Sequence, residues 1–370
     1  MMLLLLLHFP LLVMVYGQQG VILPLSELIE THGLETRSVF KQYPILQKIM
    51  TAHDGNIYAL PRINENYHYL MPQKMWIYEP WLTKLGLEMP TTTEEFYHVL
   101  KAFKEQDPNG NGISDEIPLA GNNEDPFSSV ASFIMNAFVF YNQIMNQSLS
   151  LEDGRVQADF NKVGYRNGLE YLNKLYNEGL IAPESFTQDN RQLKDMVEQE
   201  EPIVGVVPSW GIYEFTDIQS ESRRYLDYKS IPPLKGPDGL QVTPYNPYPF
   251  DRGVFVITSN SKHPEVAFRW ADAMYSEEIT LRQVHGRPNK EWRWAQAGEI
   301  GLNGNPAHWR KLLQFGIKQN YHWYQTGPAK QDQRFRSSLA SDGIEDPEAI
   351  LYEETLMSCS INDLFSMKTT

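Results

Sequence analysis

The stretch Asp107-Pro-Asn-Gly-Asn-Gly-Ile-Ser-Asp-Glu116 carries the sharpest chemical signal of the chain. Hard divalent cations prefer oxygen ligands, which a calcium loop supplies from alternate residues around a glycine at its sixth position. Asp107, Asn109 and Asn111 occupy the first, third and fifth positions, and Gly112 is the sixth. The spacing predicts a calcium loop, although Asp, Asn and Gly also favour turns that hold no metal.

The rest of the loop departs from an EF-hand. Ile113, at the seventh position, can offer only its backbone carbonyl, and Asp115 is the ninth residue. The twelfth position, where an EF-hand has a bidentate Glu, is Pro118. Glu116 is the nearest replacement, so we expect this loop to close more tightly than an EF-hand does.

A helix leads directly into the loop. Pro90-Thr-Thr-Thr-Glu-Glu-Phe96 predicts a helix start, with Thr91 and Glu94 at capping-box spacing. Other helices are expected from Ser26, over 125–143 and 161–177, and after residues 261–264 through Ala267, Trp270 and Met274. We assign Trp270 to the core.

Short apolar runs between these helices predict buried strands. They cover residues 55–60, 74–78, 203–207 and 253–258, and residues 228–237 are expected to be extended. Strands that alternate with longer helices indicate an α/β fold.

The amino-acid composition limits the kinds of molecule that the protein is expected to bind. The chain has 370 residues, enough for two domains, and a formal net charge of −14, which argues against nucleic-acid binding. Its 8 Trp, 20 Tyr and 17 Phe suit sugar ligands better than nucleotides. Cys359 is the only cysteine, so neither an internal disulfide nor a cysteine metal cluster is expected.

The apolar start of the chain has three readings. Residues 1–15 are too few to span a bilayer as a helix, and no basic residue precedes Arg37. The run can be a degenerate secretory signal, a buried segment or the wrong start of a truncated reading frame.

An ordered series of motifs resembles the extracellular solute-binding proteins (family 1) of bacterial ABC importers. The closest group is the lipoprotein-type sugar and oligosaccharide binders of Gram-positive bacteria, with alginate-oligosaccharide binders among their relatives. The resemblance covers about residues 16–355 and rests on the segments 55–62, 72–77, 81–86, 90–96, 107–119, 231–239 and 256–265.

This resemblance implies a two-lobe periplasmic-binding-protein-like fold of the class II type, in which strands are exchanged at a hinge. We place the first lobe at 1–77 and 253–305, and the second at 78–252 and 306–370, with crossings near Ile77 and Arg252. Because both ends depart from the family pattern, we expect a fragment with an incomplete first lobe and no lipid-accepting cysteine. The resemblance also implies a structural calcium ion held by Asp107, Asn109, Asn111, Ile113, Asp115 and Glu116.

Ligand-binding candidates are aromatic, amide and arginine side chains near strand ends, since sugars are held by stacking and by hydrogen bonds to their hydroxyls. An aromatic residue is more often part of the core than of a site, and Arg252 could equally form a hinge salt bridge. The candidates are Arg62, Asn64, Asn66, Tyr67, Gln73, Trp76, Trp210, Tyr245, Arg252, Trp294 and Trp323.

The expected function is capture of a sugar or oligosaccharide at the cell surface, by hinge closure, for the membrane subunits of an ABC permease. A monomer is expected. One alternative is an inactive or poorly folded fragment of such a protein. Another is a glycan hydrolase, but none of the common nucleophile, zinc or phosphate motifs is present, and acidic pairs alone decide nothing among 46 acidic residues.

Overall fold

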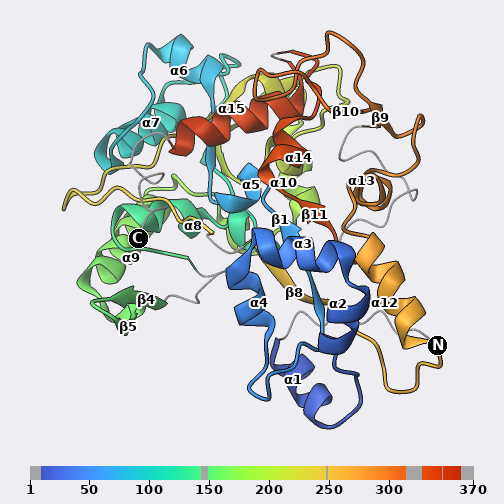
Figure 1. Cartoon of the computed structure of the whole chain (residues 1–370). Coiled ribbons are helices and arrows are strands. Elements are labelled where there is room, and N and C mark those ends of the chain that lie inside the picture. The colour runs from blue at the N-terminus through green and yellow to red at the C-terminus, as the bar shows by residue number, and fades with distance from the viewer. Residues whose placement is uncertain (1–9, 143–148, 247–248, 314–326, 344, 360–370) are drawn as a thin grey trace. The chain divides into compact units, whose positions relative to one another are not determined.

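Two groups of buried strands organise the chain, whose structure is a computed structural model. The structure describes residues 10–142, 149–246, 249–313, 327–343 and 345–359 (Figure 1). The chain divides into unit 1, Met1–Asn66 with Tyr248–Ser341, and unit 2, Tyr67–Pro247 with Asp342–Thr370. Helices and strands alternate in both units, so the predicted α/β class is confirmed.

Unit 1 contains seven of the described helices and five of the described strands. They are α1 (Pro10–Gln18), α2 (Ser26–His32), α3 (Leu34–Gln42), α4 (Pro44–Met50), β1 (Leu60–Asn64), β8 (Phe250–Phe255), α12 (Pro264–Ala273), α13 (Glu277–His285), β9 (Trp292–Trp294), β10 (Trp309–Lys311), β11 (Lys330–Gln331) and α14 (Gln333–Ser337).

Unit 2 contains the remaining described helices and strands. They are α5 (Tyr67–Leu70), β2 (Met75–Tyr78), α6 (Glu79–Leu85), α7 (Thr93–Glu105), β3 (Ile117–Leu119), α8 (Val130–Ile134), β4 (Leu149–Glu152), β5 (Arg155–Ala158), α9 (Val163–Asn177), α10 (Asn190–Val197), β6 (Val204–Pro208), α11 (Ile212–Phe215), β7 (Tyr228–Ser230) and α15 (Pro347–Cys359).

The unit boundaries lie elsewhere than the sequence suggested. Strand β2 pairs with β6 and β7, so the chain has entered unit 2 before Ile77. Strands β10 and β11 pair with β9 and β1, which places residues 306–341 in unit 1 and not with the second lobe. These short strands pair with partners that are distant in the sequence, and the apolar runs do not predict such pairing.

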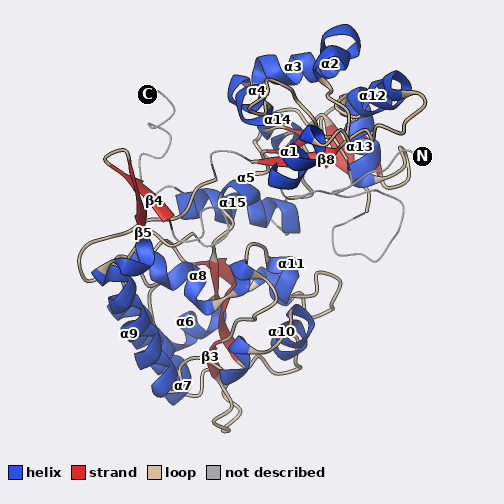
Figure 2. Cartoon of the chain, turned by 90° about the horizontal axis from the view of Figure 1, so that it is seen from below, coloured by secondary structure: helices blue, strands red, loops and turns tan. Residues whose placement is uncertain are grey.

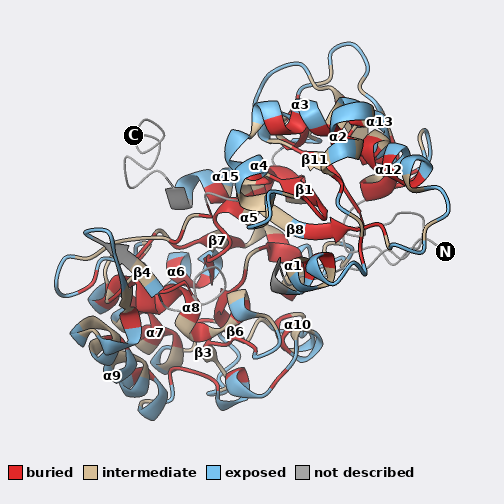
Figure 3. Cartoon of the chain, turned by 60° about the horizontal axis from the view of Figure 1, so that its bottom comes forward, coloured by how far each residue is buried: buried red, intermediate tan, exposed pale blue. Residues whose placement is uncertain are grey.

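The central sheet of unit 1 has the order β11-β1-β8, with β1 parallel to β11 and antiparallel to β8. Its register shifts between Leu60 and Arg62, around Pro61, which has no N–H to donate to a ladder. Ile63 and Phe255 pack into a core with helices α2, α3 and α12. Strand β1 is buried along its length and β8 over residues 253–255, and Figure 3 shows exposed residues on the helices around them.

The sheet of unit 2 has the order β3-β6-β2-β7 and is buried along β2 and β6. Apolar runs without alternation are expected where both faces of a strand are covered. Gly205 in β6 permits this packing, because a Cβ there would lie 2.5 Å from the Phe103 ring of α7. Figure 2 shows the helices of this unit around its strands.

Two predicted helices need correction. Helix α7 is capped by Thr92 and Glu95, one residue after the predicted pair, and Thr91 only adds a hydrogen bond to the Glu95 carboxylate. The helix expected over 125–143 is instead a 3-10 turn, the short helix α8 and another 3-10 turn, and residue 143 lies outside the described residues. The Asn136 amide bonds to the Ser132 carbonyl and thereby competes with helix continuation.

Two predicted strands also begin at other residues than expected. In the run 55–60 only Leu60 belongs to a strand, β1, and Ile57 forms an isolated bridge with Thr51. Strand β8 starts at Phe250, before Gly253, because it pairs with β1 from that point. Within the described part of the chain, no helix is long and apolar enough to cross a membrane.

Candidate functional site

Strand β1 places two predicted ligand residues, Arg62 and Asn64, on one face of the unit 1 sheet. Arg62 is in register with Asp251 on β8, and Asn64 with Gln331 on β11. Successive side chains point to opposite faces of a strand. Ile63 points into the hydrophobic core, so these four polar side chains share the opposite face.

An ion pair ties β1 to β8 on this face. The Arg62 guanidinium donates from Nε to Asp251 Oδ2 at 2.8 Å, with a second bond from Nη2 to the same oxygen. Arg62 is buried, so its charge is neutralised within the sheet. The ion pair of this strand therefore involves Asp251 and Arg62; Arg252 is exposed.

Asn64 and Asn66 are both buried, and the side-chain oxygen of each has no hydrogen-bond partner among the described residues. The Asn66 amide nitrogen lies 3.5 Å from Gln331 Oε1, which accepts its hydrogen bond. Glu65, between them, points elsewhere and accepts a hydrogen bond from the Tyr43 hydroxyl at 2.7 Å.

An aromatic group in unit 2 surrounds Trp210, which follows strand β6. The Trp210 and His68 rings stack at 5.4 Å with an interplanar angle of 26°, and Tyr213 contacts the indole edge-on at 5.1 Å. Tyr67 contacts Tyr352 of α15 edge-on at 4.6 Å. Trp210 is half-buried, as a residue that contacts ligand needs to be.

Two donors from strand β2 and the residue before it hold the backbone around Trp210. The Trp76 indole donates to the Ser209 carbonyl at 2.9 Å. Lys74 Nζ donates to the Met71 carbonyl at 2.6 Å and to the Trp210 carbonyl at 3.4 Å. Lys74 is fully buried, and burial lowers the pKa of its amine to about 7.

Trp76 itself is a core residue, which corrects its prediction as a ligand residue. Its exposed fraction is 0%, because β2 lies inside the sheet, and its ring packs near Phe215. Gln73 is also buried, and its side-chain oxygen accepts a hydrogen bond from Asn136 at 2.8 Å. Tyr245 is partly buried and packs against Leu70 and Met71.

The later tryptophans have different environments. Trp294 is 43% exposed and contacts Trp292, which is fully buried in the small core of β9 and β10. Trp323 lies outside the described residues. Trp270 was expected in the core, but it is 37% exposed, although its ring lies near that of the buried Phe255.

The loop at 107–116 folds around its own side chains. Asp107 has a φ of 46° and its carboxylate accepts hydrogen bonds from the backbone N–H groups of Gly110 at 2.9 Å and Gly112 at 3.0 Å. The amides of Asn109 and Asn111 donate to the Asp115 carboxylate at 3.0 and 3.1 Å. Side-chain oxygens are therefore concentrated within one tight turn.

Glu116 is the loop residue whose environment best fits a cation. One of its carboxylate oxygens is buried and has no hydrogen-bond partner in the part of the chain that the structure describes. Burial raises the pKa of this carboxyl above its ordinary value, and the nearby carboxylates of Asp107 and Asp115 raise it further. Strand β3 begins at the next residue and includes Pro118, which explains why the twelfth position carries no ligand.

Among the described residues, no three His, Cys, Asp or Glu side chains are grouped as metal ligands. In the loop, amide nitrogens occupy the Asp115 carboxylate. The donor chemistry fits calcium, and a bound ion would require amide oxygens in place of those nitrogens.

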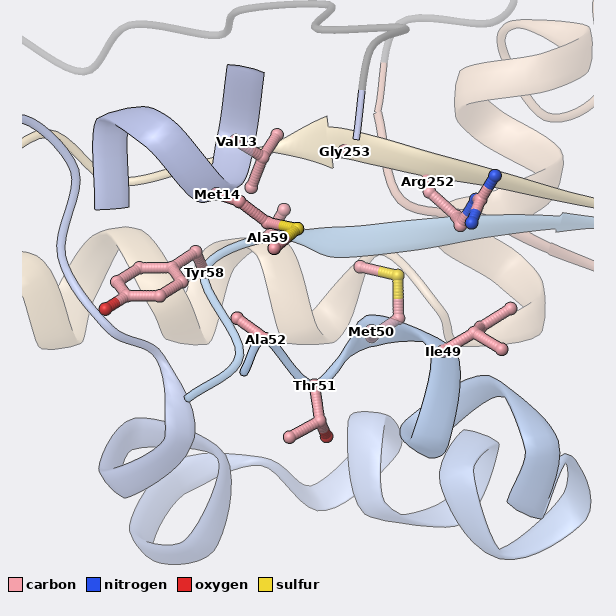
Figure 4. A pocket seen from close by; sticks show the side chains of 10 residues that line it. All are labelled: Val13, Met14, Ile49, Met50, Thr51, Ala52, Tyr58, Ala59, Arg252 and Gly253. Carbon is pink, nitrogen blue, oxygen red and sulfur yellow. The ribbon is translucent and has the colours of Figure 1, made fainter. Parts of the chain in front are cut away.

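Two cavities of unit 1 lie apart from the Arg62–Asn66 segment. The first, of about 50 Å³, lies between α1, α4 and β8, with Met14, Met50 and Arg252 in its lining (Figure 4). It is far smaller than ordinary ligand pockets of roughly 300 Å³ or more. The second, of about 280 Å³, lies between α12 and α13 and includes Trp270 and Arg282 in its lining.

Sequence reasoning missed His68, Lys74, Tyr213 and Gln331. His68 and Tyr213 contact Trp210 through folding, and Gln331 joins Asn64 through a parallel pair formed across a long separation. Lys74 gave one usable signal, a cation directly before the apolar run 75–78.

Comparison with known families gives a match to bacterial extracellular solute-binding proteins over residues 11–280. The fructooligosaccharide ABC transporter substrate-binding protein FusA of Streptococcus pneumoniae serotype 4 (strain ATCC BAA-334 / TIGR4) is 32% identical over 271 residues, which cover 70% of this chain and 48% of FusA. Lipoprotein LipO of Bacillus subtilis (strain 168) is 30% identical over 63% of this chain and 46% of its own. The chain thus spans about half the length of the curated relatives it matches.

Solved structures agree with this relationship. Streptococcus pneumoniae FusA in complex with kestose matches with a TM-score of 0.74 and 26% identity over 94% of this chain and 70% of FusA. An extracellular solute-binding protein from Bifidobacterium longum subsp. infantis has the same fold, with a TM-score of 0.72 and 24% identity over 93% of this chain and 69% of its own. The chain belongs to the bacterial extracellular solute-binding protein family, a family of binding proteins and not of enzymes.

Proposed function

We propose that this protein captures an oligosaccharide outside the cell and delivers it to the membrane subunits of an ABC importer. Family membership supports a binding role, and FusA, which is named for fructooligosaccharide transport, supports a carbohydrate ligand. A second relative, YtcQ of Bacillus subtilis (strain 168), is named as a polygalacturonan/rhamnogalacturonan-binding protein.

The observation that carries the proposal is the setting of Trp210. This half-buried indole stands directly after a buried strand, with its ring stacked on His68 and its backbone carbonyl bonded to Lys74. A fixed aromatic ring beside polar groups is the arrangement that holds the apolar face of a sugar.

The proposed ligand residues of each unit follow from these environments. In unit 1 we retain Arg62, Asn64, Asn66, Arg252 and Trp294. In unit 2 we retain Tyr67, Gln73, Trp210 and Tyr245, and we leave out Trp76 because it is enclosed in the sheet.

We further propose that ligand shifts the protein toward a closed form, as a hinge between lobes would allow. Small-angle X-ray scattering of the free and ligand-saturated protein tests this part. A smaller radius of gyration with ligand is expected, and an unchanged radius would contradict closure without affecting the binding proposal.

We also propose a structural calcium ion in the loop 107–116. Asp107, Asn109, Asn111, Asp115 and Glu116 would supply side-chain oxygens, and Ile113 a backbone carbonyl. The unpartnered Glu116 oxygen supports this proposal, as does a structure similar to this chain that is described as a FusA EF-hand mutant. The ion would neutralise the crowded carboxylates and stabilise the loop.

A thermal-shift screen against an oligosaccharide panel tests the proposed function. A ligand that binds only the native state raises the melting temperature, and the shift grows with the logarithm of ligand concentration above Kd. Concentration-dependent stabilisation by an oligosaccharide is expected, whereas no response from a cooperatively folding sample would contradict it. Release of reducing sugar from any glycan in the panel would contradict the binding role.

A further inference from the structure

One face of the sheet β11-β1-β8 is polar although it is buried. It carries Arg62 and Asn64 of β1, with their register partners Asp251 and Gln331. Asn66 follows two residues after Asn64 and bonds to the same Gln331 side chain, so it continues this row. A polar row enclosed in a protein is stable only where its groups find partners.

Two groups of this row lack such partners. Asn64 is 5% exposed and Asn66 is 3% exposed, and the Oδ1 atom of each is enclosed without a hydrogen bond. The Asn66 nitrogen is committed to Gln331, so its oxygen is the free acceptor. Each enclosed acceptor destabilises the free protein while it remains unpaired. Both oxygens therefore require a donor that the described part of the chain does not supply.

The charges beside these acceptors are already paired. Arg62 is bonded to Asp251 on the same face. Lys330 is in register with Ile63, so it lies on the opposite face, where its ammonium is 3.9 Å from Asp332. The cations next to these acceptors, Arg62 and Lys330, are thus both paired, and the exposed Arg252 lines the separate cavity between α1, α4 and β8.

We propose, on the basis of the proposed function, that Asn64 and Asn66 accept hydrogen bonds from hydroxyl groups of a neutral oligosaccharide and select against glycans that contain uronic acids. A sugar hydroxyl donates a hydrogen bond, whereas an ionised carboxylate can only accept one. A uronate placed here would meet two acceptors, remain unpaired and bear the full cost of leaving water.

Titration calorimetry with the full chain tests this selectivity. The neutral probes are kestose, maltotriose and mannotriose, and the acidic probes are trigalacturonate and trimannuronate. We expect at least one neutral probe to bind and both acidic probes to bind at least about tenfold more weakly, the cost of one unmade hydrogen bond. Equal or tighter binding of an acidic probe would overturn the inference and leave the proposed function intact. Binding of no probe would contradict both.

The variants Asn64→Leu and Asn66→Leu separate a ligand role from a structural one. Each should weaken binding of the neutral probe about tenfold. The melting temperature of the free Asn64→Leu protein should stay equal or rise, because an unpaired polar atom has been removed, whereas Asn66→Leu also removes the hydrogen bond to Gln331. A lower melting temperature with unchanged affinity would mean that the amides serve only the fold, and would overturn the inference.

Asn122→Leu is the matched control in unit 2. Asn122 is as deeply buried, but its amide is fully used: it donates to Asn190 at 2.6 Å and accepts from the N–H groups of Glu124 and Asp125 at 3.0 Å. Its replacement should lower the melting temperature. Opposite effects of Asn64→Leu and Asn122→Leu on the melting temperature would identify the Asn64 oxygen as an acceptor kept for a ligand.

Discussion

At the scale of single residues, position and not residue type separates the aromatic side chains of this protein. Trp76 and Trp210 lie close together through β2 and the end of β6, yet Trp76 is enclosed and Trp210 is half-buried. The Trp76 indole serves Trp210 indirectly, because it bonds to the neighbouring Ser209 carbonyl. Of the two rings, therefore, only that of Trp210 can stack on a ligand, and that of Trp76 holds the neighbouring backbone in place.

Replacing Trp210 with Ala should weaken oligosaccharide binding without unfolding unit 2. The loss of a fixed stacking residue is expected to cost about 2 kcal/mol, or roughly thirtyfold in Kd. Titration calorimetry measures the change. Phe186→Ala, which removes an exposed ring next to Tyr176, is the matched control and should leave Kd unchanged. Equal affinity of Trp210→Ala and the unmodified protein would remove Trp210 from the proposed site.

Lys74 should make stability depend on pH. Burial lowers its pKa from 10.5 to about 7, so between these values the unfolded chain binds a proton that the folded chain does not. The free energy of unfolding therefore rises with pH across this window, by at most roughly 1.4 kcal/mol per pH unit from this group. Lys74→Met removes this contribution.

Urea unfolding at pH 7.0, 8.0 and 9.0 measures the effect. The difference in unfolding free energy between the unmodified protein and Lys74→Met should grow with pH, since other titrating groups are common to both. Lys101→Met, which removes a partly exposed lysine of α7, is the matched control. A difference that stays constant with pH would show that Lys74 keeps its charge in the fold.

At the scale of helices, strands and loops, local sequence patterns predicted that an element is present better than they predicted the residues at which it begins and ends. The capping signal before α7 was correct in kind, but the helix uses Thr92 because the Thr93 N–H is bonded to Lys235 across the unit. The apolar runs of β2 and β6 were recognisable since both strands are covered on both faces. The interrupted helix near α8 was not, because Asn136 ends it through side-chain contacts that depend on folding.

Thr92→Ala should destabilise helix α7 more than Thr91→Ala does. The Thr92 hydroxyl accepts the Glu95 backbone N–H at 3.1 Å, whereas Thr91 bonds only to the Glu95 side chain. Loss of an N-cap costs about 1 kcal/mol. Urea unfolding of the two variants compares them, and a larger loss for Thr91→Ala would favour the capping pair suggested by sequence.

The loop 107–116 should make the melting temperature sensitive to a calcium chelator. A cation bound only to the native state stabilises it, and its removal leaves the carboxylates of Asp107, Asp115 and Glu116 to repel one another. The unmodified protein should melt at a lower temperature in chelator than in calcium, and Asp107→Ala should melt at the same temperature in both.

Asp238→Ala, which removes an exposed carboxylate outside the loop, is the control and should retain the chelator response. Magnesium in place of calcium should restore little stability, because it demands a stricter octahedral geometry. If the unmodified protein melts at one temperature in calcium and in chelator, the loop is an ordinary turn.

At the scale of the whole molecule, the motif series identified the family, and the fold places its motifs in two units. The resemblance gave the α/β class and a binding role, both of which rest on ordered segments spread along the chain. It did not give the unit boundaries, because short strands such as β11 acquire their place only by pairing with distant partners. Only part of the candidate site could be predicted from the sequence. The ends of strands indicated Arg62, Asn64 and Trp210, but the residues that contact them come from elsewhere in the chain.

Titration calorimetry of the full chain with kestose, alongside the same experiment on Trp210→Ala, tests the central claim most directly. The account predicts saturable heat from the unmodified protein, consistent with a single site, and a Kd roughly thirtyfold weaker in the variant. The absence of heat with kestose and with every other oligosaccharide tested, in a sample that melts cooperatively, would contradict it.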